Sequence, residues 1–346
     1  MNGQIRDFGK TAEGIPVKEI TLDNGILSCS VLTYGAVLRT LFVKDRDGKK
    51  TDIVLGYESL EEYRTQGGYL GAVVGRYANR IAGSSFELNG VKYMLEENDR
   101  GNHLHSASAG FSSRIWEIEE AEKDRVCLSL VSEDGDGGYP GTLRVRMTYA
   151  LKDNALEMLY QATSDSDTVC NLTNHAYYNL AGQGSGDVLE QWLQIEADAF
   201  TPSDAQDIPF GTLEPVEGTP MDFREKHTIG ERIRDQYIQL IQAGGYDHNF
   251  VLRGEAGKLR RVARAGSDRT GIRMTVESTL PGMQLYTANG FAERNGKNGE
   301  HYGNNAGFCL ETQYYPDSPN KPEFPSCILK KGEEYEQKTV FRFDTV

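Results

Sequence analysis

The chain is poor in cysteine, and its cysteines form no recognisable cluster. Five are spread along the sequence (Cys29, Cys127, Cys170, Cys309 and Cys327), and no Cys-x-x-Cys pair occurs. This spacing excludes a zinc knuckle and a dithiol redox motif, and an odd, sparse set is typical of a reducing compartment. Membrane-length hydrophobic runs and a secretory signal pattern are also missing. We therefore expect a cytoplasmic protein that does not enter the membrane.

Positive charge is scarce as well. Lysine and arginine number 37 against 51 aspartates and glutamates, which gives a formal net charge of −14 over 346 residues. This balance argues against a nucleic-acid partner, because such proteins carry a basic surface. An acidic surface also repels anionic membranes and does not attract phosphorylated substrates. The expected ligand is a neutral small molecule.

Long helical patterns are few, whereas short strand-like runs separated by turn residues dominate. Short turn sequences separate such runs at Asp23-Asn24-Gly25, Asn89-Gly90 and Asp153-Asn154. Each predicts a hairpin, since these residues tolerate the positive φ that tight turns require. We predict one all-β domain over residues 1–346, a large antiparallel β-sandwich whose loops and strand ends carry the binding residues.

Two capping-box sequences predict the few short helices. The first is Ser59-Leu60-Glu61-Glu62. The second is Thr228-Ile229-Gly230-Glu231, which precedes spaced apolar residues and the stop signal Gly244-Gly245.

Two histidines lie close together in His103-Leu104-His105. On a strand both would face the same side and could form a metal pair, but an ion needs three or four ligands and no third one is suggested nearby. Exposed imidazoles at a strand end are the plainer interpretation. We favour His105 as a hydrogen-bond donor inside a polar cleft and predict no metal.

Several polar residues are candidates for contacts with a polyhydroxyl ligand. Arg76, Asn79 and Arg80 donate hydrogen bonds in fixed geometry, although arginines on a surface strand would fit the spacing equally well. Asp247 could accept hydroxyl protons or form an Asx turn. Gln284 ends an alternating run and could be either an inward polar residue or an exposed one.

The strongest candidates for chemistry are a histidine and a carboxylate far apart in the sequence. His175 stands among polar and aromatic residues in the segment 172–180, and Glu311 follows the apolar run 307–310. On opposite sides of one pocket, such a pair can give a proton to one oxygen and take one from another.

Taken together, these segments resemble the aldose 1-epimerases, or galactose mutarotases. The resemblance covers nearly the whole chain in family order, and its most specific parts are the motif around His175 and Glu-Thr-Gln-x-x-Pro-Asp at 311–317. The matching stretches are 75–81, 102–105, 134–141, 171–182, 245–250, 281–290 and 307–325.

The resemblance implies a mutarotase-type sandwich without cofactor or metal that interconverts the anomers of free aldohexoses such as galactose and glucose. His175 matches the family's general acid at the ring oxygen, and Glu311 matches its general base at the anomeric hydroxyl. His105 matches a second histidine at the ring oxygen. The positions matching substrate-binding residues are Asn79, Arg80, Asp247 and Gln284.

Three other functions remain open: a hexose-phosphate epimerase, which would need more arginines; a non-catalytic sugar-binding sandwich, which would not need both His175 and Glu311; and a glycosidase using two carboxylates.

One position departs from the family pattern. Ser106-Ala107 stands where two glycines are expected, and its side chains could narrow the pocket. Cys309, two residues before Glu311, is expected to be a buried, inert thiol.

Overall fold

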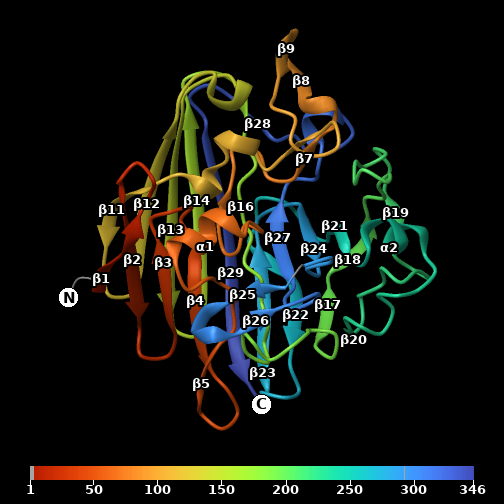
Figure 1. Ribbon diagram of the computed structural model, residues 1–346. Helices are drawn as coiled ribbons and strands as arrows, with labels where there is room; N and C mark the ends of the chain where they lie inside the picture. Colours follow the sequence, from red (N-terminus) through yellow and green to blue (C-terminus); the bar gives the residue numbers. More distant parts are fainter. Residues whose placement is uncertain (1–3, 292) are drawn as a thin grey trace.

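The computed structural model describes residues 4–291 and 293–346, and antiparallel sheet dominates it, as predicted (Figure 1). The largest sheet contains, in spatial order, β11 (Glu117–Ala121), β12 (Arg125–Ser132), β13 (Leu143–Lys152), β14 (Ala155–Ser164), β29 (Glu334–Thr345), β23 (Ile272–Ser278), β22 (Arg260–Gly266), β17 (Trp192–Ile195) and β20 (His227–Thr228).

Two smaller sheets complete the framework. The N-terminal sheet follows sequence order: β1 (Gln4–Lys10), β2 (Pro16–Asp23), β3 (Ser28–Leu32), β4 (Leu38–Lys44) and β5 (Lys50–Asp52). The other, called here the site sheet, has the order β19 (Glu214–Pro215), β18 (Ala197–Phe200), β21 (Asp247–Leu252), β24 (Gly282–Tyr286) and β27 (Cys309–Gln313).

Short two-stranded ribbons connect these sheets. They are β6 (Val73–Val74) with β16 (Thr173–Asn174), β7 (Arg80–Ile81) with β10 (His103–Leu104), β8 (Ser85–Leu88) with β9 (Val91–Met94), β15 (Thr168–Val169) with β28 (Ile328–Leu329), and β25 (Arg294–Asn295) with β26 (His301–Tyr302).

The three predicted hairpins are confirmed. Asp23 pairs with Ser28 between β2 and β3, and the β8–β9 and β13–β14 hairpins close at their predicted turns. Asn89 and Asp153 adopt positive φ values of 54° and 51°, the backbone conformation that favours Asn and Asp in such turns.

One helix prediction is confirmed and the other is wrong at its start. Helix α1 (Leu60–Thr65) begins after Ser59, whose side chain caps the Glu62 amide. Helix α2 (Ile238–Ala243) ends at Gly244 as predicted, but Thr228 belongs to strand β20. The amides of Ile229 and Gly230 bind the carbonyls of Gln191 and Leu189, so pairing with a neighbouring segment replaces the expected helix. Single turns of 3₁₀ helix cover 82–84, 107–109, 111–113, 136–138, 297–299 and 318–320.

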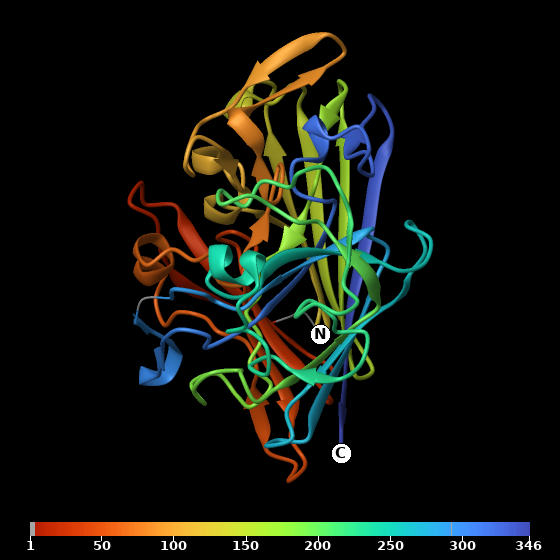
Figure 2. The same ribbon diagram turned by 90° about the vertical axis from the view of Figure 1, so that its right-hand side faces the viewer.

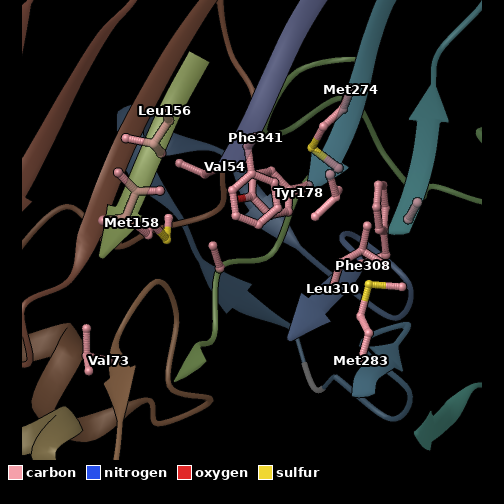
Figure 3. Packing of buried hydrophobic residues seen from close by; sticks show 14 of the residues in the cluster. Val54, Val73, Leu156, Met158, Tyr178, Met274, Met283, Phe308, Leu310 and Phe341 are labelled. Carbon is pink, nitrogen blue, oxygen red and sulfur yellow. The ribbon is translucent and has the colours of Figure 1, made fainter. Parts of the chain in front are cut away.

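One hydrophobic cluster contains residues from the nine-stranded sheet, the N-terminal sheet and the site sheet. It includes Ile20 of β2, Met147 of β13 and Leu285 of β24. In Figure 2 the long strands of the nine-stranded sheet, green and dark blue, run along one side of the molecule. Figure 3 shows Tyr178 against Phe341 in this core, with ring centroids 5.0 Å apart. No helix in the described part of the chain is both long and apolar enough to cross a membrane.

Alternation along the site sheet separates the core from the polar face. Met283, Leu285 and Leu310 point into the hydrophobic cluster. Their neighbours Gln284 and Glu311 pair directly across β24 and β27 and therefore share the opposite face. The sheet thus presents buried polar side chains on a rigid support.

Candidate active site

A cavity of about 220 Å³ lies over the polar face of the site sheet. Six of the seven predicted site residues line it: Asn79, Arg80, His105, His175, Asp247 and Glu311. These residues come from the β7–β10 ribbon and the positions that flank it, from the turn after β16, and from strands β21 and β27. The volume is below the ~300–1,000 Å³ typical of pockets for drug-sized ligands, so the cavity suits one small molecule.

The turn that carries His175 is held by backbone hydrogen bonds and by Asn174. The His175 amide donates to the carbonyl of Ala72. The buried Asn174 side chain donates to the Gly71 carbonyl and to Tyr149, and accepts from the Ala176 amide. The chain therefore has little freedom at His175, which is 5% exposed.

Aromatic rings fix the plane of the His175 imidazole. Tyr69 and Tyr177 stack on it at centroid distances of 5.7 and 5.0 Å, and Tyr286 meets it edge-on. In this plane Nε2 lies 3.7 Å from Glu311 Oε1, and Nδ1 lies 3.5 Å from Cys309 Sγ. The sequence prediction that His175 and Glu311 meet in one pocket is confirmed as geometry.

Burial shifts both members of this pair toward their neutral states. Loss of solvation lowers the pKa of His175 to about 4. Burial, together with the nearby Asp247 carboxylate, raises the pKa of Glu311 well above its usual range, and Arg80 partly offsets this. Within residues 4–291 and 293–346, Glu311 Oε2 has no hydrogen-bond partner, although it is buried. The carboxyl group thus keeps an unused acceptor in the site.

His105 is locked by Asn79. The Asn79 amide donates to His105 Nδ1 (3.0 Å), and the His105 amide donates to the Asn79 carbonyl (3.1 Å). Since Nδ1 accepts, the proton of the neutral ring is on Nε2. Burial, with the nearby His175, holds the pKa of His105 well below its usual value. His105 is therefore a neutral donor within the cavity wall.

Arg80 and Asp247 form the charged end of the cavity. Arg80 Nε donates to Asp99 at 2.7 Å, and Arg80 Nη2 lies 3.2 Å from Asp207. Burial raises the pKa of Asp247, and Arg80 opposes that shift. Gln284, the seventh predicted residue, does not line the cavity; its Nε2 donates to Asp247 Oδ1 at 2.7 Å. Gln284 thus orients Asp247 without lining the cavity itself.

Some sequence candidates lie elsewhere. His103 turns away from His105, with Nδ1 against the Glu96 carbonyl at 2.6 Å, because the strand ends at Leu104 and His105 has a positive φ. Arg76 is buried and donates to the carbonyls of Ser132, Pro140 and Gly141, so it is not a ligand-binding group.

Ser106 and Ala107 do not line the cavity. The Ser106 hydroxyl accepts from the Tyr77 amide and lies 3.4 Å from the Tyr139 hydroxyl. Both residues adopt the left-handed conformation, with φ values of 64° and 48°, which explains why glycine suits these positions. The departure from the family pattern therefore affects backbone strain and not the space in the pocket.

The sequence predictions missed the aromatic and C-terminal part of the wall. Tyr69, Tyr177, Tyr286, Asn289, Phe291 and Arg294 also line the cavity. Tyr177 follows His175 by two residues and Tyr286 follows Gln284 by two, so period-two spacing from the predicted residues would have found them. Tyr69 has no such signal, because a glycine-rich turn with positive φ brings it to the site.

His105, His175 and Glu311 each offer one potential ligand atom, all within 4.8 Å of one another. Ligands bound to one zinc ion lie roughly 3.3 Å apart, given bonds of ~2.0–2.1 Å in tetrahedral geometry. The three side chains would have to draw together to hold an ion. All three side chains line the cavity, where each can form a hydrogen bond to a small organic molecule.

Another cavity, of about 240 Å³, lies on the N-terminal sheet, and its charged groups are already paired. Lys297 donates to Asp52 and to two carbonyls, and Arg39 lies against Glu19. It lacks the combination of a histidine and a carboxyl group that marks the first cavity.

Comparisons with known proteins point to one family. The aldose 1-epimerase family model matches residues 18–342. A galactose mutarotase from Rattus norvegicus is 41% identical over 97% of each chain, and an aldose 1-epimerase from Escherichia coli K12 is 36% identical over 96% of each.

Solved structures show the same fold. An aldose epimerase homologue from C. elegans has a TM-score of 0.88 at 31% identity, covering 95% of this chain and 99% of that one. Galactose 1-epimerase from Lactobacillus acidophilus NCFM has a TM-score of 0.86 at 27% identity, covering 100% and 99%. The chain belongs to the aldose 1-epimerase family.

Proposed function

We propose that this aldose 1-epimerase opens and recloses the ring of free aldohexoses such as galactose and glucose, with His175 as general acid and Glu311 as general base. The observation that carries the proposal is the buried contact of 3.7 Å between His175 Nε2 and Glu311 Oε1 in a cavity of monosaccharide size. His175, in the turn after β16, and Glu311, on strand β27, both line this cavity.

The chemistry requires one proton at each end of the reacting bond. Glu311 takes the proton from the anomeric hydroxyl, and His175 gives one to the ring oxygen as the bond from the ring oxygen to C1 breaks. Rotation about C1–C2 then turns the aldehyde, and reclosure on its other face returns both protons. Each proton transfer contributes ~10²–10⁴-fold to the rate. The reaction involves no net transfer of protons or electrons, and it needs no covalent intermediate between enzyme and sugar.

The remaining wall residues orient the sugar in this proposal. His105 donates from Nε2 to the ring oxygen, while Arg80 and Asp247 bind hydroxyl groups at the charged end. Asn79 lines the same end, and Gln284 fixes Asp247. Tyr69, Tyr177 and Tyr286 cover the apolar C–H faces of the sugar and exclude water from the pair.

A hexose-phosphate substrate is disfavoured by the arginines. Arg76 is committed to backbone carbonyls, and Arg80 is already paired with Asp99 and Asp207. A phosphate at this end would have to compete with these carboxylates.

Polarimetry on freshly dissolved α-D-galactose and α-D-glucose tests the proposal. The enzyme should speed the approach to anomeric equilibrium, and exhaustive chelation should leave the rate unchanged because no cofactor or metal is required. Unaccelerated mutarotation of both sugars would overturn the proposal. Activity lost on chelation and restored by one metal would assign His105, His175 and Glu311 to an ion instead. Release of aglycone from a galactoside would reveal a glycosidase.

A further inference from the structure

We propose that Cys309 is a positioning residue, whose thiol donates to His175 Nδ1 and thereby holds the imidazole proton on Nε2, the nitrogen that faces Glu311. This inference rests on the acid role proposed for His175. It assigns a function to a buried group that the proton transfers themselves do not use.

The contact is specific. Cys309 Sγ lies 3.5 Å from His175 Nδ1, and no other hydrogen bond to either ring nitrogen of His175 is found among the described residues. Cys309 and Glu311 are two residues apart on β27 and so point to the same face of the site sheet. Strand β27 therefore places a side chain beside each nitrogen of the His175 ring. The thiol lies beside Nδ1, and the carboxyl group lies beside Nε2.

The ring cannot exchange these partners by flipping freely. Tyr69 and Tyr177 stack on the imidazole, with interplanar angles of 25° and 26°, and Tyr286 closes its edge. The His175 backbone is tied to Ala72 and Gly71. The tautomer, and not the orientation of the ring, is the remaining freedom.

The thiol is suited to act as the donor. Cys309 is 0% exposed, and burial with the nearby Glu311 raises the pKa of the thiol well above its usual value, so sulfur keeps its hydrogen. A neutral imidazole has one donor and one acceptor nitrogen. An S–H group at Nδ1 favours the lone pair there, which leaves the N–H on Nε2.

His105 shows the same arrangement within this site. Its Nδ1 accepts from the Asn79 amide, which leaves the proton on Nε2. The two histidines of the cavity therefore follow one rule: a protein donor occupies Nδ1, and Nε2 is left as the hydrogen donor. In His175 the donor is a side chain, so substitution can remove it.

Nitrogen-15 NMR of the histidine side chains at neutral pH, with resonances of His175 identified from their loss in His175→Asn, tests the proposal. The wild type should show His175 with its proton on Nε2. Cys309→Ala should populate the form with the proton on Nδ1 and lower kcat roughly 3- to 10-fold, the effect of one lost hydrogen bond, with KM unchanged. Cys309→Ser, which keeps a donor, should retain the wild-type tautomer and most of kcat.

Cys29→Ala is the matched control, because Cys29 is equally buried but lies in the hydrophobic cluster without a histidine partner. It should change neither the tautomer nor kcat. A His175 proton on Nδ1 in the wild type, or an unchanged tautomer in Cys309→Ala, would overturn the proposal. These readings do not depend on catalysis, whereas full activity of His175→Asn would overturn the proposed acid role alone.

Discussion

Burial of His175 and Glu311 in one small cavity controls which of them carries a charge. The acid and base roles expected from the sequence require an ionised Glu311 and a His175 that holds the transferable proton. The structure opposes both charges, since burial holds the pKa of His175 at about 4 and raises that of Glu311. At 3.7 Å the two groups titrate as a coupled pair, and the active species is the pair that holds one proton to be shared.

This coupling predicts the pH profile of kcat/KM. The profile should be bell-shaped, with an acid limb near pH 4, where the imidazole binds a second proton. The alkaline limb should reflect loss of the last proton that the pair holds, above the usual range of a carboxyl group because the pKa of Glu311 is raised. Initial rates by polarimetry from pH 3.5 to 9 would measure both limbs. An acid limb that disappears in Glu311→Gln but stays in His175→Asn would contradict this assignment.

Arg80 and Asp247 allow a second prediction at the residue scale. Arg80→Ala or Asp247→Ala should lower kcat/KM roughly 10- to 150-fold, because hydrogen bonds to charged groups contribute ~1.5–3 kcal/mol. The loss should fall mainly on KM, with the circular dichroism spectrum unchanged. Arg253→Ala is the matched control, since Arg253 forms a surface ion pair with Asp198 away from the cavity. Unchanged kinetics in well-folded Arg80 and Asp247 variants would remove these residues from the binding site.

Much of the site could be predicted from sequence at this scale, and the exceptions have physical causes. His175 and Glu311 stand in motifs whose residue types already indicate their chemistry, whereas Arg80 fitted a surface strand equally well. His103 failed as a partner of His105 because the strand stops between them, which spacing does not reveal. Tyr69 reaches the cavity through consecutive left-handed residues, and no period of two or 3.6 describes such a path.

At the scale of elements, the turn after β10 shows how a departure in sequence is accommodated. His105, Ser106 and Ala107 all have positive φ, and the chain continues into the single 3₁₀ turn that ends at Ala109. The hydrogen bond from the Tyr77 amide to the Ser106 hydroxyl offsets strain at that residue. Ala107 has no comparable compensation, since a methyl group cannot form a hydrogen bond.

Replacing Ala107 by glycine should therefore stabilise the protein. A left-handed conformation costs a residue with a β-carbon about 1–2 kcal/mol, so Ala107→Gly should raise the free energy of unfolding by ~1 kcal/mol. Ala109→Gly is the control, because Ala109 has a negative φ and should lose ~0.5–1 kcal/mol. Urea denaturation measures both. Because neither residue lines the cavity, the ratio of galactose to glucose turnover should not change.

The difference between local and long-range interactions explains which elements could be predicted from the sequence. Hairpins at Asn89-Gly90 and Asp153-Asn154 are local, so the turn residues and flanking runs are sufficient. The helix at Thr228–Glu231 failed because strand β17, more than thirty residues upstream, supplies a partner for that backbone. Local propensity cannot account for such pairing.

At the scale of the whole molecule, one hydrophobic cluster extends from Ile20 to Phe343 and supports the site sheet from behind. The sequence predicted the all-β class from its turns and alternation, but not the order of the nine-stranded sheet, which depends on long-range pairing such as β29 between β14 and β23. The family resemblance supplied the fold where periodicity could not.

Buried histidines make the stability of this fold depend on pH. His248 is buried, and desolvation lowers its pKa to about 4 from a usual 6.5. The unfolded chain therefore binds the proton more readily, and the contribution of His248 to stability is present above pH 6.5 and lost as the pH falls toward 4. The loss amounts to roughly 3 kcal/mol.

His248→Asn, which keeps an acceptor for the Asp247 amide, should reduce the fall in the free energy of unfolding between pH 6.5 and 4. His301→Asn, at an exposed position, is the matched control. Urea titrations at several pH values measure the slopes. Equal slopes in the His248 variant and the wild type would contradict a buried neutral imidazole.

The coupled action of His175 and Glu311 is tested most directly by the mutarotation rates of Glu311→Gln, His175→Asn and the double variant, measured by polarimetry with sugar binding followed in parallel. Each single variant should lose at least ~10²-fold in kcat while still binding sugar. The double variant should be little slower than either, because the two groups serve one proton transfer. Near-normal turnover in Glu311→Gln, or losses that multiply in the double variant, would contradict the account.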